Sequence, residues 1–173
     1  MTRVTTHLFL GGARSGKSSA AQRLALSRGG TPVYVATARP SQDEEFGARL
    51  ARHREDRGDA WRTVEEDLDL VGALAAYRGP DHVVVVDCLT LWLTNLVLDE
   101  RDVEAATDGL CAELAEDRGD VALVSNEVGQ GTVPMHPLTR GFRDHQGRLN
   151  QRVAATVDRV RLLVAGIEVS VKG

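Results

Sequence analysis

The 173-residue sequence lacks most of the features that mark secreted, membrane-spanning or nucleic-acid-binding proteins. Its two cysteines, Cys88 and Cys111, fit neither a disulfide framework nor a metal-ligand spacing. No apolar run approaches the roughly 20 residues that cross a bilayer, and the first strand-like run begins too near residue 1 for a signal peptide. A net charge of −4 gives no general basic surface for nucleic acid. These absences predict a cytoplasmic protein with no membrane span and no nucleic-acid partner.

What the sequence does contain is typical of one ordinary globular domain. Hydrophobic residues make up 42% of the chain, and there is no internal repeat, low-complexity segment or linker. We therefore expect residues 1–173 to form a single domain. The arginines gather in two stretches, residues 49–57 and 140–148, where local anion sites can form on an acidic protein.

Apolar runs alternate with helical patterns along the chain. The strand-like runs are 6–10, 32–37, 82–87, 121–125, 160–164 and a short one at 167–171. The helical patterns cover 17–28, 43–57, 67–77, 89–98, 102–118 and 149–158. Strands that alternate with helices form a mostly parallel sheet with helices on both faces. The predicted fold class is therefore α/β, in which ligands bind at the carboxyl ends of the strands.

Residues 11–18 form a complete G-x-x-x-x-G-K-[ST] phosphate loop, placed between a strand-like run and a helical pattern. Backbone N–H groups of such a loop cradle phosphates, and the N-terminus of the next helix adds a positive dipole. Lys17 would reach the β- and γ-phosphates, and the Ser18 hydroxyl would bind Mg²⁺. The motif predicts a P-loop NTPase-like fold that binds a nucleoside triphosphate, without saying what is done with it.

Three further strand ends carry reactive side chains, at Thr37–Arg39, Asp87 and Ser125–Glu127. We expect them to converge on the phosphate loop, because the ends of parallel strands meet at one edge of the sheet. The run Val83–Asp87 matches a Walker B pattern, in which the carboxylate faces the Mg²⁺ held by Ser18. The same carboxylate could instead cap the following helix. In that case the metal role would pass to another residue, such as Glu127.

The stretch 48–57 is unusual because His53 has an arginine on each side and Arg57 one helical turn further on. One interpretation is a solvated basic helix whose histidine is only a surface residue. The other is a neutral imidazole nucleophile among cations that bind a triphosphate, because histidine can form covalent intermediates and guanidinium groups stabilise charge at phosphorus. The residues by themselves leave both interpretations open.

A series of motifs in a fixed order gives the chain a family resemblance. They are residues 11–18, 34–38, 52–54, 61–63, 87–90, 94–96, 126–129, 133–134, 142–144, 147–148 and 150–151. Asn-Glu-Val-Gly, Phe-Arg-Asp and Gly-Arg-x-Asn-Gln are far more specific than a phosphate loop. On these motifs the sequence resembles the bifunctional adenosylcobinamide kinase / adenosylcobinamide-phosphate guanylyltransferase family of cobalamin biosynthesis over nearly its whole length.

The resemblance implies two reactions. In the first, ATP or GTP gives its γ-phosphoryl group to the aminopropanol hydroxyl of adenosylcobinamide. In the second, GTP transfers GMP to an enzyme histidine that aligns with His53, and the GMP passes to the new phosphate to give adenosyl-GDP-cobinamide. The resemblance also implies a homotrimer in which partner subunits form part of the site.

The resemblance assigns roles residue by residue. It makes His53 catalytic, beside Lys17 as the catalytic lysine and Ser18 and Asp87 as the Mg²⁺ ligands that the phosphate loop and the Walker B pattern already indicate. The implied nucleotide contacts are Gly11, Gly12, Ala13, Arg14, Ser15, Gly16, Lys17, Ser18, Thr37, Ala38, Arg39, Arg54, Glu55, Asp56, Arg57, Glu65 and Asp87. Family members often have Pro where Gly58 stands and Met where Phe46 stands, and neither departure removes a group that the chemistry needs.

Two other functions remain to be weighed against this one. A single-activity P-loop small-molecule kinase would leave His53 as a bystander. A regulatory GTP-binding module is disfavoured because the sequence has no Asn-Lys-x-Asp guanine signature.

Overall fold

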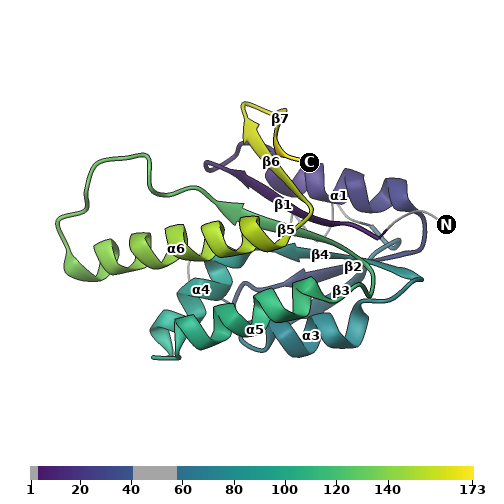
Figure 1. The fold of residues 1–173 in the computed structure, drawn as a ribbon, viewed down its shortest axis with the longest axis horizontal. Coiled ribbons are helices and arrows are strands. Elements are labelled where there is room, and N and C mark those ends of the chain that lie inside the picture. The colour runs from purple at the N-terminus through teal and green to yellow at the C-terminus, as the bar shows by residue number, and fades with distance from the viewer. Residues whose placement is uncertain (1–3, 41–57) are drawn as a thin grey trace.

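The computed structural model describes residues 4–40 and 58–173 (Figure 1). The predicted helix 43–57 lies outside these described residues. The elements in chain order are β1 (Thr6–Gly11), α1 (Lys17–Arg28), β2 (Thr31–Ala36), β3 (Arg62–Glu65), α3 (Leu70–Tyr77), β4 (His82–Asp87), α4 (Leu89–Leu98), α5 (Val103–Ala115), β5 (Asp120–Asn126), α6 (Pro137–Thr156), β6 (Arg159–Val164) and β7 (Ile167–Lys172). None of the described helices is both long and apolar enough to cross a membrane.

The strands form one sheet in the order β3-β2-β4-β5-β1-β6-β7. All described pairings are parallel except the last, in which β7 returns antiparallel to β6. This order places β5 between β1, which leads into the phosphate loop, and β4, which ends at Asp87. The carboxyl ends of these three strands therefore lie side by side at one edge of the sheet.

Helices cover both faces of the sheet (Figure 1). Helix α1 packs on one face against β1, β4 and β5, and helices α3 to α6 form the layer on the other face. The alternation of side chains along β4 explains why four consecutive positions of this strand, Val83–Val86, are all apolar. Val84 and Val86 belong to the core under α3 and α4, whereas Val83 and Val85 belong to the core under α1. A strand buried on both faces has no polar side, as the unbroken valine run predicts.

The predictions for 17–28, 82–87 and 89–98 are confirmed residue for residue, and the other strands that were predicted agree to within one residue at each end. The prediction of a helix at 149–158 is wrong at its start, because α6 already begins at Pro137. Proline fits the first helical position, where its missing N–H has no partner to lose, and His136 Nδ1 accepts from Leu138 N. Two interior glycines weaken the sequence signal of this helix.

Three smaller differences have local causes. Strand β3 was not predicted, because its four residues lie at the sheet edge and are mostly exposed, which leaves no apolar run to detect. Helix α3 starts at Leu70 rather than at residue 67, since the Asp69 carboxylate accepts from Gly72 N and caps the first turn. Helix α5 starts one residue later than predicted because Asp102 caps it in the same way, and it ends three residues earlier.

His7 is a buried titratable residue on β1. Its Nε2 lies 3.0 Å from Thr5 Oγ1 and 3.3 Å from a guanidinium nitrogen of Arg28. Burial is the main cause that lowers the pKa of His7 to about 4, and the Arg28 charge adds to it. Arg159 and Arg161 act in the same direction. The folded protein therefore keeps this imidazole neutral.

We predict that the wild type loses stability relative to His7→Gln as the pH falls from 7 to 5. In the unfolded chain the histidine has a pKa of 6.5 and takes up a proton in this range, whereas folded His7 stays neutral until about pH 4. The unfolded state thus binds more protons, which costs the wild type about 2 kcal/mol at pH 5. Urea denaturation of both proteins at the two pH values measures the difference. Parallel pH dependence would contradict a neutral buried His7.

Candidate active site

Two glycines shape the phosphate loop between β1 and α1. At Gly11, a Cβ atom would lie 2.5 Å from the Leu163 carbonyl oxygen, so no larger residue fits without moving β6. Gly16 has a φ of 97°, in the left-handed region, immediately before the first helical turn. The loop geometry therefore requires glycine at both positions, as the motif predicts.

Lys17 folds back over the loop that precedes it. Its Nζ donates to the Gly12 carbonyl oxygen at 2.6 Å and lies 3.4 Å from Ser15 Oγ. The residue is only 6% exposed. An ammonium group held against the loop is placed to meet the β- and γ-phosphates of a nucleotide in it.

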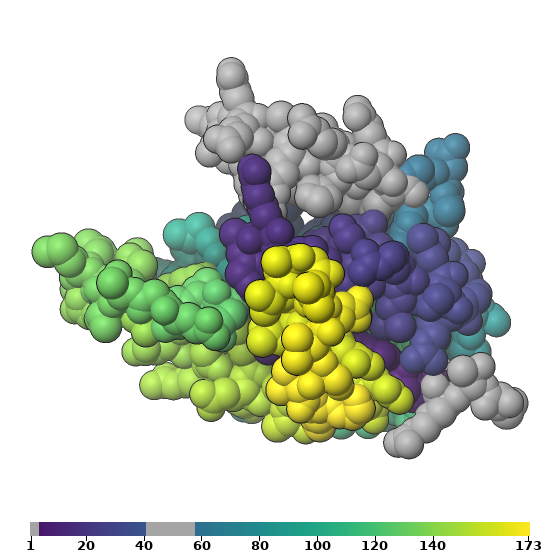
Figure 2. Space-filling view, turned by 90° about the horizontal axis from the view of Figure 1, so that it is seen from above, coloured from purple at the N-terminus to yellow at the C-terminus, as the bar shows by residue number. Residues whose placement is uncertain are grey.

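Neighbouring elements hold the loop from two directions. Glu127 N donates to the Gly11 carbonyl oxygen at 3.1 Å, from the end of β5. Gly166 N donates to the Ser15 carbonyl oxygen at 2.9 Å, from the turn between β6 and β7. Figure 2 shows this C-terminal hairpin, in yellow, packed beside the purple N-terminal part of the chain. The start and the middle of the loop are thus tied to strands on either side of β1.

Asp87 does not cap α4, so that interpretation of its role is wrong. The cap position is Cys88, and no side chain caps the helix. The Asp87 Oδ2 atom instead accepts a hydrogen bond from the Tyr34 hydroxyl at 2.6 Å. The Asp87 carboxylate is therefore half-buried at the carboxyl end of β4 and oriented by a tyrosine, at the edge of the sheet where a metal ion would be held.

Thr37 fastens the end of β2 to the end of β4. Its hydroxyl donates to the Cys88 carbonyl oxygen at 2.7 Å and lies 2.8 Å from Cys88 N, which donates to it. Asn95 Nδ2 donates to the Thr37 carbonyl oxygen at 2.8 Å. Thr37 is fully buried, so it fixes the shape of the edge at which Ala38 follows. The Cys88 thiol beside it is also buried, and desolvation raises its pKa to about 11.

Arg39 is engaged by two carboxylates. Its Nε pairs with Asp67, and its two terminal nitrogens donate to the carboxylate oxygens of Asp99 at 2.8 and 2.7 Å. The hydrogen bonds to Asp99, followed by that to Asp67, raise the pKa of Arg39. These three bonds use three of the five N–H donors of the guanidinium group, so Arg39 can contact a nucleotide without losing a partner.

The remaining predicted contacts divide into two groups. Glu65 ends β3 level with Ala36, and Ala36 is also level with Asp87, so both carboxylates lie at the same edge as the phosphate loop. His53 and the charged residues Arg54, Glu55, Asp56 and Arg57 lie outside the described residues. Their roles therefore stay predictions.

The donor set of this edge fits Mg²⁺. Hard cations take oxygen ligands, and Mg²⁺ is usually held by one or two carboxylates together with substrate phosphates. Ser18 supplies a hydroxyl at the start of α1, and Asp87 supplies a carboxylate. Among the described residues no three His, Cys, Asp or Glu side chains gather as a metal cluster, so a protein-only cage for a metal is not formed by this part of the chain.

Sequence reasoning missed the role of α6, whose buried polar side chains hold the end of β5. The Ser125 hydroxyl donates to Asn150 Oδ1 at 2.6 Å, and Gln146 Nε2 donates to both at 2.9 and 3.0 Å. Asn150 Nδ2 donates to the Asn126 carbonyl oxygen at 3.0 Å. The signal available was the polar pair four residues apart on a helix face that also carries buried Leu149 and Val153.

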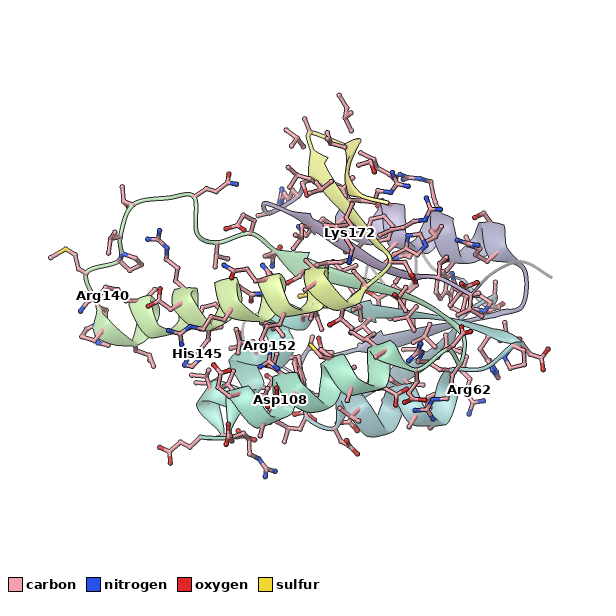
Figure 3. The ribbon with its side chains drawn as sticks, in the orientation of Figure 1. Arg62, Asp108, Arg140, His145, Arg152 and Lys172 are labelled. Carbon is pink, nitrogen blue, oxygen red and sulfur yellow. The ribbon has the colours of Figure 1, made fainter. Side chains whose placement is uncertain are left out.

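Two arginines of the stretch 140–148 hydrogen-bond to backbone carbonyl groups of the preceding segment. Arg143 donates to the Gly129 carbonyl oxygen at 2.6 Å, and Arg140 donates to the carbonyl oxygens of Pro134 and Met135 at 3.0 and 2.6 Å. Arg140 lies near the outer end of α6, as Figure 3 shows. These guanidinium groups therefore fasten the segment between β5 and α6 to the helix.

The strand order, the phosphate loop and the carboxylate at the end of β4 define a P-loop nucleotide-binding α/β protein. An ATPase of the type III secretion system of pathogenic bacteria has a TM-score of 0.56 at 10% identity, over 96% of this chain and 56% of that chain. A Pyrococcus horikoshii protein has a TM-score of 0.58 at 11% identity, over 99% of this chain and 88% of that chain. At these identities the likeness concerns the fold alone.

Sequence comparison gives the family. A sequence model described as cobinamide kinase / cobinamide phosphate guanyltransferase matches residues 7–171. The bifunctional adenosylcobalamin biosynthesis protein CobP of Pseudomonas aeruginosa is 45% identical over 168 residues, which are 96% of each chain. CobU of Escherichia coli, described in the same words, is 38% identical over 180 residues, 95% of this chain and 98% of its own. The chain belongs to the cobinamide kinase / cobinamide phosphate guanyltransferase family, and the resemblance seen in the motifs is confirmed.

We predict that Asp87→Asn raises the Mg²⁺ concentration needed for half-maximal kinase activity by about tenfold or more, since even groups that only orient a metal ligand are worth this much. Asparagine keeps the shape and the contact to Tyr34 but removes the charge. Asp102→Asn is the control, because Asp102 lies outside the site and asparagine caps α5 nearly as well as aspartate. Titration of kinase activity with MgCl₂ measures the effect. An unchanged requirement would move the metal role away from Asp87.

Proposed function

We propose that this chain phosphorylates the aminopropanol hydroxyl of adenosylcobinamide and then transfers GMP to the product, with one phosphate loop serving both reactions. The observation that carries the proposal is the loop itself, with Lys17 held against it and Asp87 at the same sheet edge, in a chain that matches the family over residues 7–171. Both reactions are displacements at phosphorus of a bound triphosphate, so positioning and electrostatics supply most of the catalysis.

In the kinase step the loop amides and Lys17 bind the phosphates and stabilise the charge that develops on them. The acceptor hydroxyl attacks the γ-phosphorus, and the bond from that phosphorus to the β-phosphate oxygen breaks. Mg²⁺ held by Ser18 and Asp87 would neutralise part of the phosphate charge when bound. A single loop–phosphate contact in such a site is commonly worth about 3–4 kcal/mol in the transition state.

In the guanylyl step a nitrogen of His53 attacks the α-phosphorus of GTP and pyrophosphate leaves. The phosphate of the first product then attacks the same phosphorus, and the bond to the histidine breaks. A neutral imidazole suits this role because it is nucleophilic near pH 7, whereas the guanidinium groups on either side stay protonated. Those guanidinium groups stabilise the leaving pyrophosphate.

The two steps require different phosphorus atoms to be open to attack. The γ-phosphorus must face an alcohol in the first step, and the α-phosphorus must face His53 in the second. We infer that the nucleotide is held differently in the two steps, with the same phosphate loop serving both.

We predict that His53→Ala abolishes covalent labelling by [α-³²P]GTP and the formation of GDP-cobinamide, but keeps a substantial part of the kinase activity. The kinase step needs Lys17 and a positioned alcohol, and neither depends on an imidazole. The labelled wild type should be labile in acid and stable in alkali, as a phosphoramidate is. Product analysis after incubation with cobinamide and GTP completes the measurement.

The matched controls are His136→Ala and His145→Ala, which remove the two histidines of α6 and its cap. Both should be labelled as well as the wild type. Labelling of His53→Ala equal to that of the wild type would remove His53 from the mechanism. Loss of label in either control would instead make the histidine replaced in that control the nucleophile. Kinase turnover with no labelling of the wild type at all would instead favour a single-activity small-molecule kinase.

We also propose that the chain assembles as a homotrimer, a stoichiometry that rests on the family resemblance. The segment before α6 and the first turn of that helix project beyond the sheet (Figures 1 and 2). Val133, Met135 and Leu138 on this projection are 68%, 97% and 59% exposed. Apolar side chains gathered on one projecting surface are typical of a contact with another protein chain.

We predict that Val133→Glu combined with Met135→Glu converts the trimer to monomers, because two charges cannot be buried there without partners. Leu26→Glu on α1 is the control. Leu26 is 58% exposed, but it lies on a different part of the surface and its replacement should leave the mass unchanged. Light scattering during size-exclusion chromatography gives the masses. A monomeric wild type would refute the assembly.

A further inference from the structure

A cavity of about 360 Å³ shares a wall with the phosphate loop. It is lined by the first part of the loop, by the segment after β5 and by the end of β6, through Gly11–Ser15, Glu127, Gln130 and Leu162–Ala165. Its volume lies near the lower end of the roughly 300–1,000 Å³ typical of small-molecule sites. The cavity can therefore hold a short chain, and the bulk of a large acceptor has to lie outside it.

The strand order brings Glu127 to the place where phosphoryl transfer happens. Strand β5 lies between β1 and β4, and Asn126 is level with Gly11, at which the phosphate loop begins. Glu127 is the next residue, and its backbone N–H donates to the Gly11 carbonyl oxygen at 3.1 Å. Among the described residues that line the cavity, Glu127 is the acidic one and Arg14 of the loop is the basic one.

The structure holds this glutamate firmly. Its Oε1 accepts from Gly129 N at 2.5 Å, and the Gly129 carbonyl oxygen accepts from Arg143 at 2.6 Å. On the other side, Asn150 holds the Asn126 carbonyl oxygen at 3.0 Å. A carboxylate positioned by α6 from two sides is built into the site rather than left on a loose loop.

The charge of Glu127 is not neutralised by any ion pair within the described ranges 4–40 and 58–173, whereas the buried Glu113 has two arginine partners there. Phosphates bound in the adjacent loop are themselves anionic, so an unpaired carboxylate beside them is unfavourable unless it has a task there. A carboxylate next to an attacking alcohol can accept the proton that the alcohol loses.

We propose that this cavity receives the hydroxyl-bearing side arm of the phosphoryl acceptor, and that Glu127 is a catalytic residue that accepts the hydroxyl proton in the kinase step. The inference rests on the proposed function. As the new oxygen–phosphorus bond forms at the γ-phosphorus, the proton passes to the Glu127 carboxylate, and the nucleoside diphosphate leaves. Leu162–Ala165 supply an apolar wall for the carbon chain of the arm, and Gln130 supplies an amide at its edge.

The test is Glu127→Gln, which keeps the size and the acceptor oxygen for Gly129 N but cannot take a proton. Its kcat for phosphorylation of cobinamide should fall about 100-fold or more, with KM for GTP changed little. Any fall of the wild-type kinase rate at acidic pH that comes from this carboxylate should be absent from the remaining activity of the variant. Labelling of the enzyme by [α-³²P]GTP should equal the wild type, because that reaction uses no acceptor alcohol.

Glu168→Gln is the matched control. Glu168 lies on the neighbouring hairpin in an exposed pair with Arg23, and its replacement should leave kinase activity and pH profile unchanged. The labelling reaction also reports whether each variant is folded and binds GTP.

Three results would overturn the assignment. Kinase activity of Glu127→Gln within about twofold of the wild type, with the same pH profile, would remove the proton-accepting role while leaving the proposed function intact. A raised Mg²⁺ requirement in both reactions would make Glu127 a metal ligand. A changed preference between ATP and GTP with unaltered kcat would assign the cavity to the nucleobase. A wild type without kinase turnover would refute the proposed function itself.

Discussion

The site depends on a short stretch of backbone that is kept in one shape by its neighbours. A loop that binds phosphates through its own amide groups works only if those amides stay fixed before the nucleotide arrives, because ordering them on binding would cost conformational entropy. Here the Gly11 carbonyl oxygen is held from the end of β5 and the Ser15 carbonyl oxygen from the turn between β6 and β7, and Lys17 folds back onto Gly12. The central part of the sheet thus acts as a rigid frame for the loop.

The same frame explains why buried polar groups are tolerated on α6. A buried amide costs free energy unless it is hydrogen-bonded. Gln146 Nε2 and both polar atoms of the Asn150 side chain bond to Ser125, to each other or to the backbone at Asn126, whereas Gln146 Oε1 has no partner among the described residues. The polar face additionally fixes where the strand ends, and therefore where Glu127 lies. The polar face of α6 thus serves to position Glu127.

The carboxylates near the phosphate loop differ in whether they have a cationic partner. Asp67 and Asp99 are both paired with Arg39. Within residues 4–40 and 58–173, the Asp87 carboxylate accepts from the Tyr34 hydroxyl and the Glu127 carboxylate accepts from Gly129 N, and neither forms an ion pair there. A residual negative charge beside bound phosphates is useful where a cation or a proton must be attracted, and these two residues flank the loop on different strands.

The sequence by itself determined the parts whose cause is local. The phosphate loop, the valine strand that ends at Asp87 and the helices at 17–28 and 89–98 follow from glycine positions, apolar runs and helical spacing, which act over a few neighbouring residues. Because the motifs are distributed over nearly the whole chain, the sequence was also sufficient to indicate the family. The sequence did not predict the full length of α6, because two interior glycines weaken its helical signal. It did not predict the edge strand β3, because that strand has no apolar run.

Tertiary structure alone decided which strand lies next to which. No local sequence pattern predicts that β5 lies between β1 and β4, yet this order brings Glu127 to the phosphate loop and α6 against the end of β5. It also decided that Asp87 bonds to Tyr34 rather than capping a helix, and that Arg140 and Arg143 fasten the segment before α6. Each of these outcomes depends on partners distant in sequence, and the packing of the whole sheet selects them.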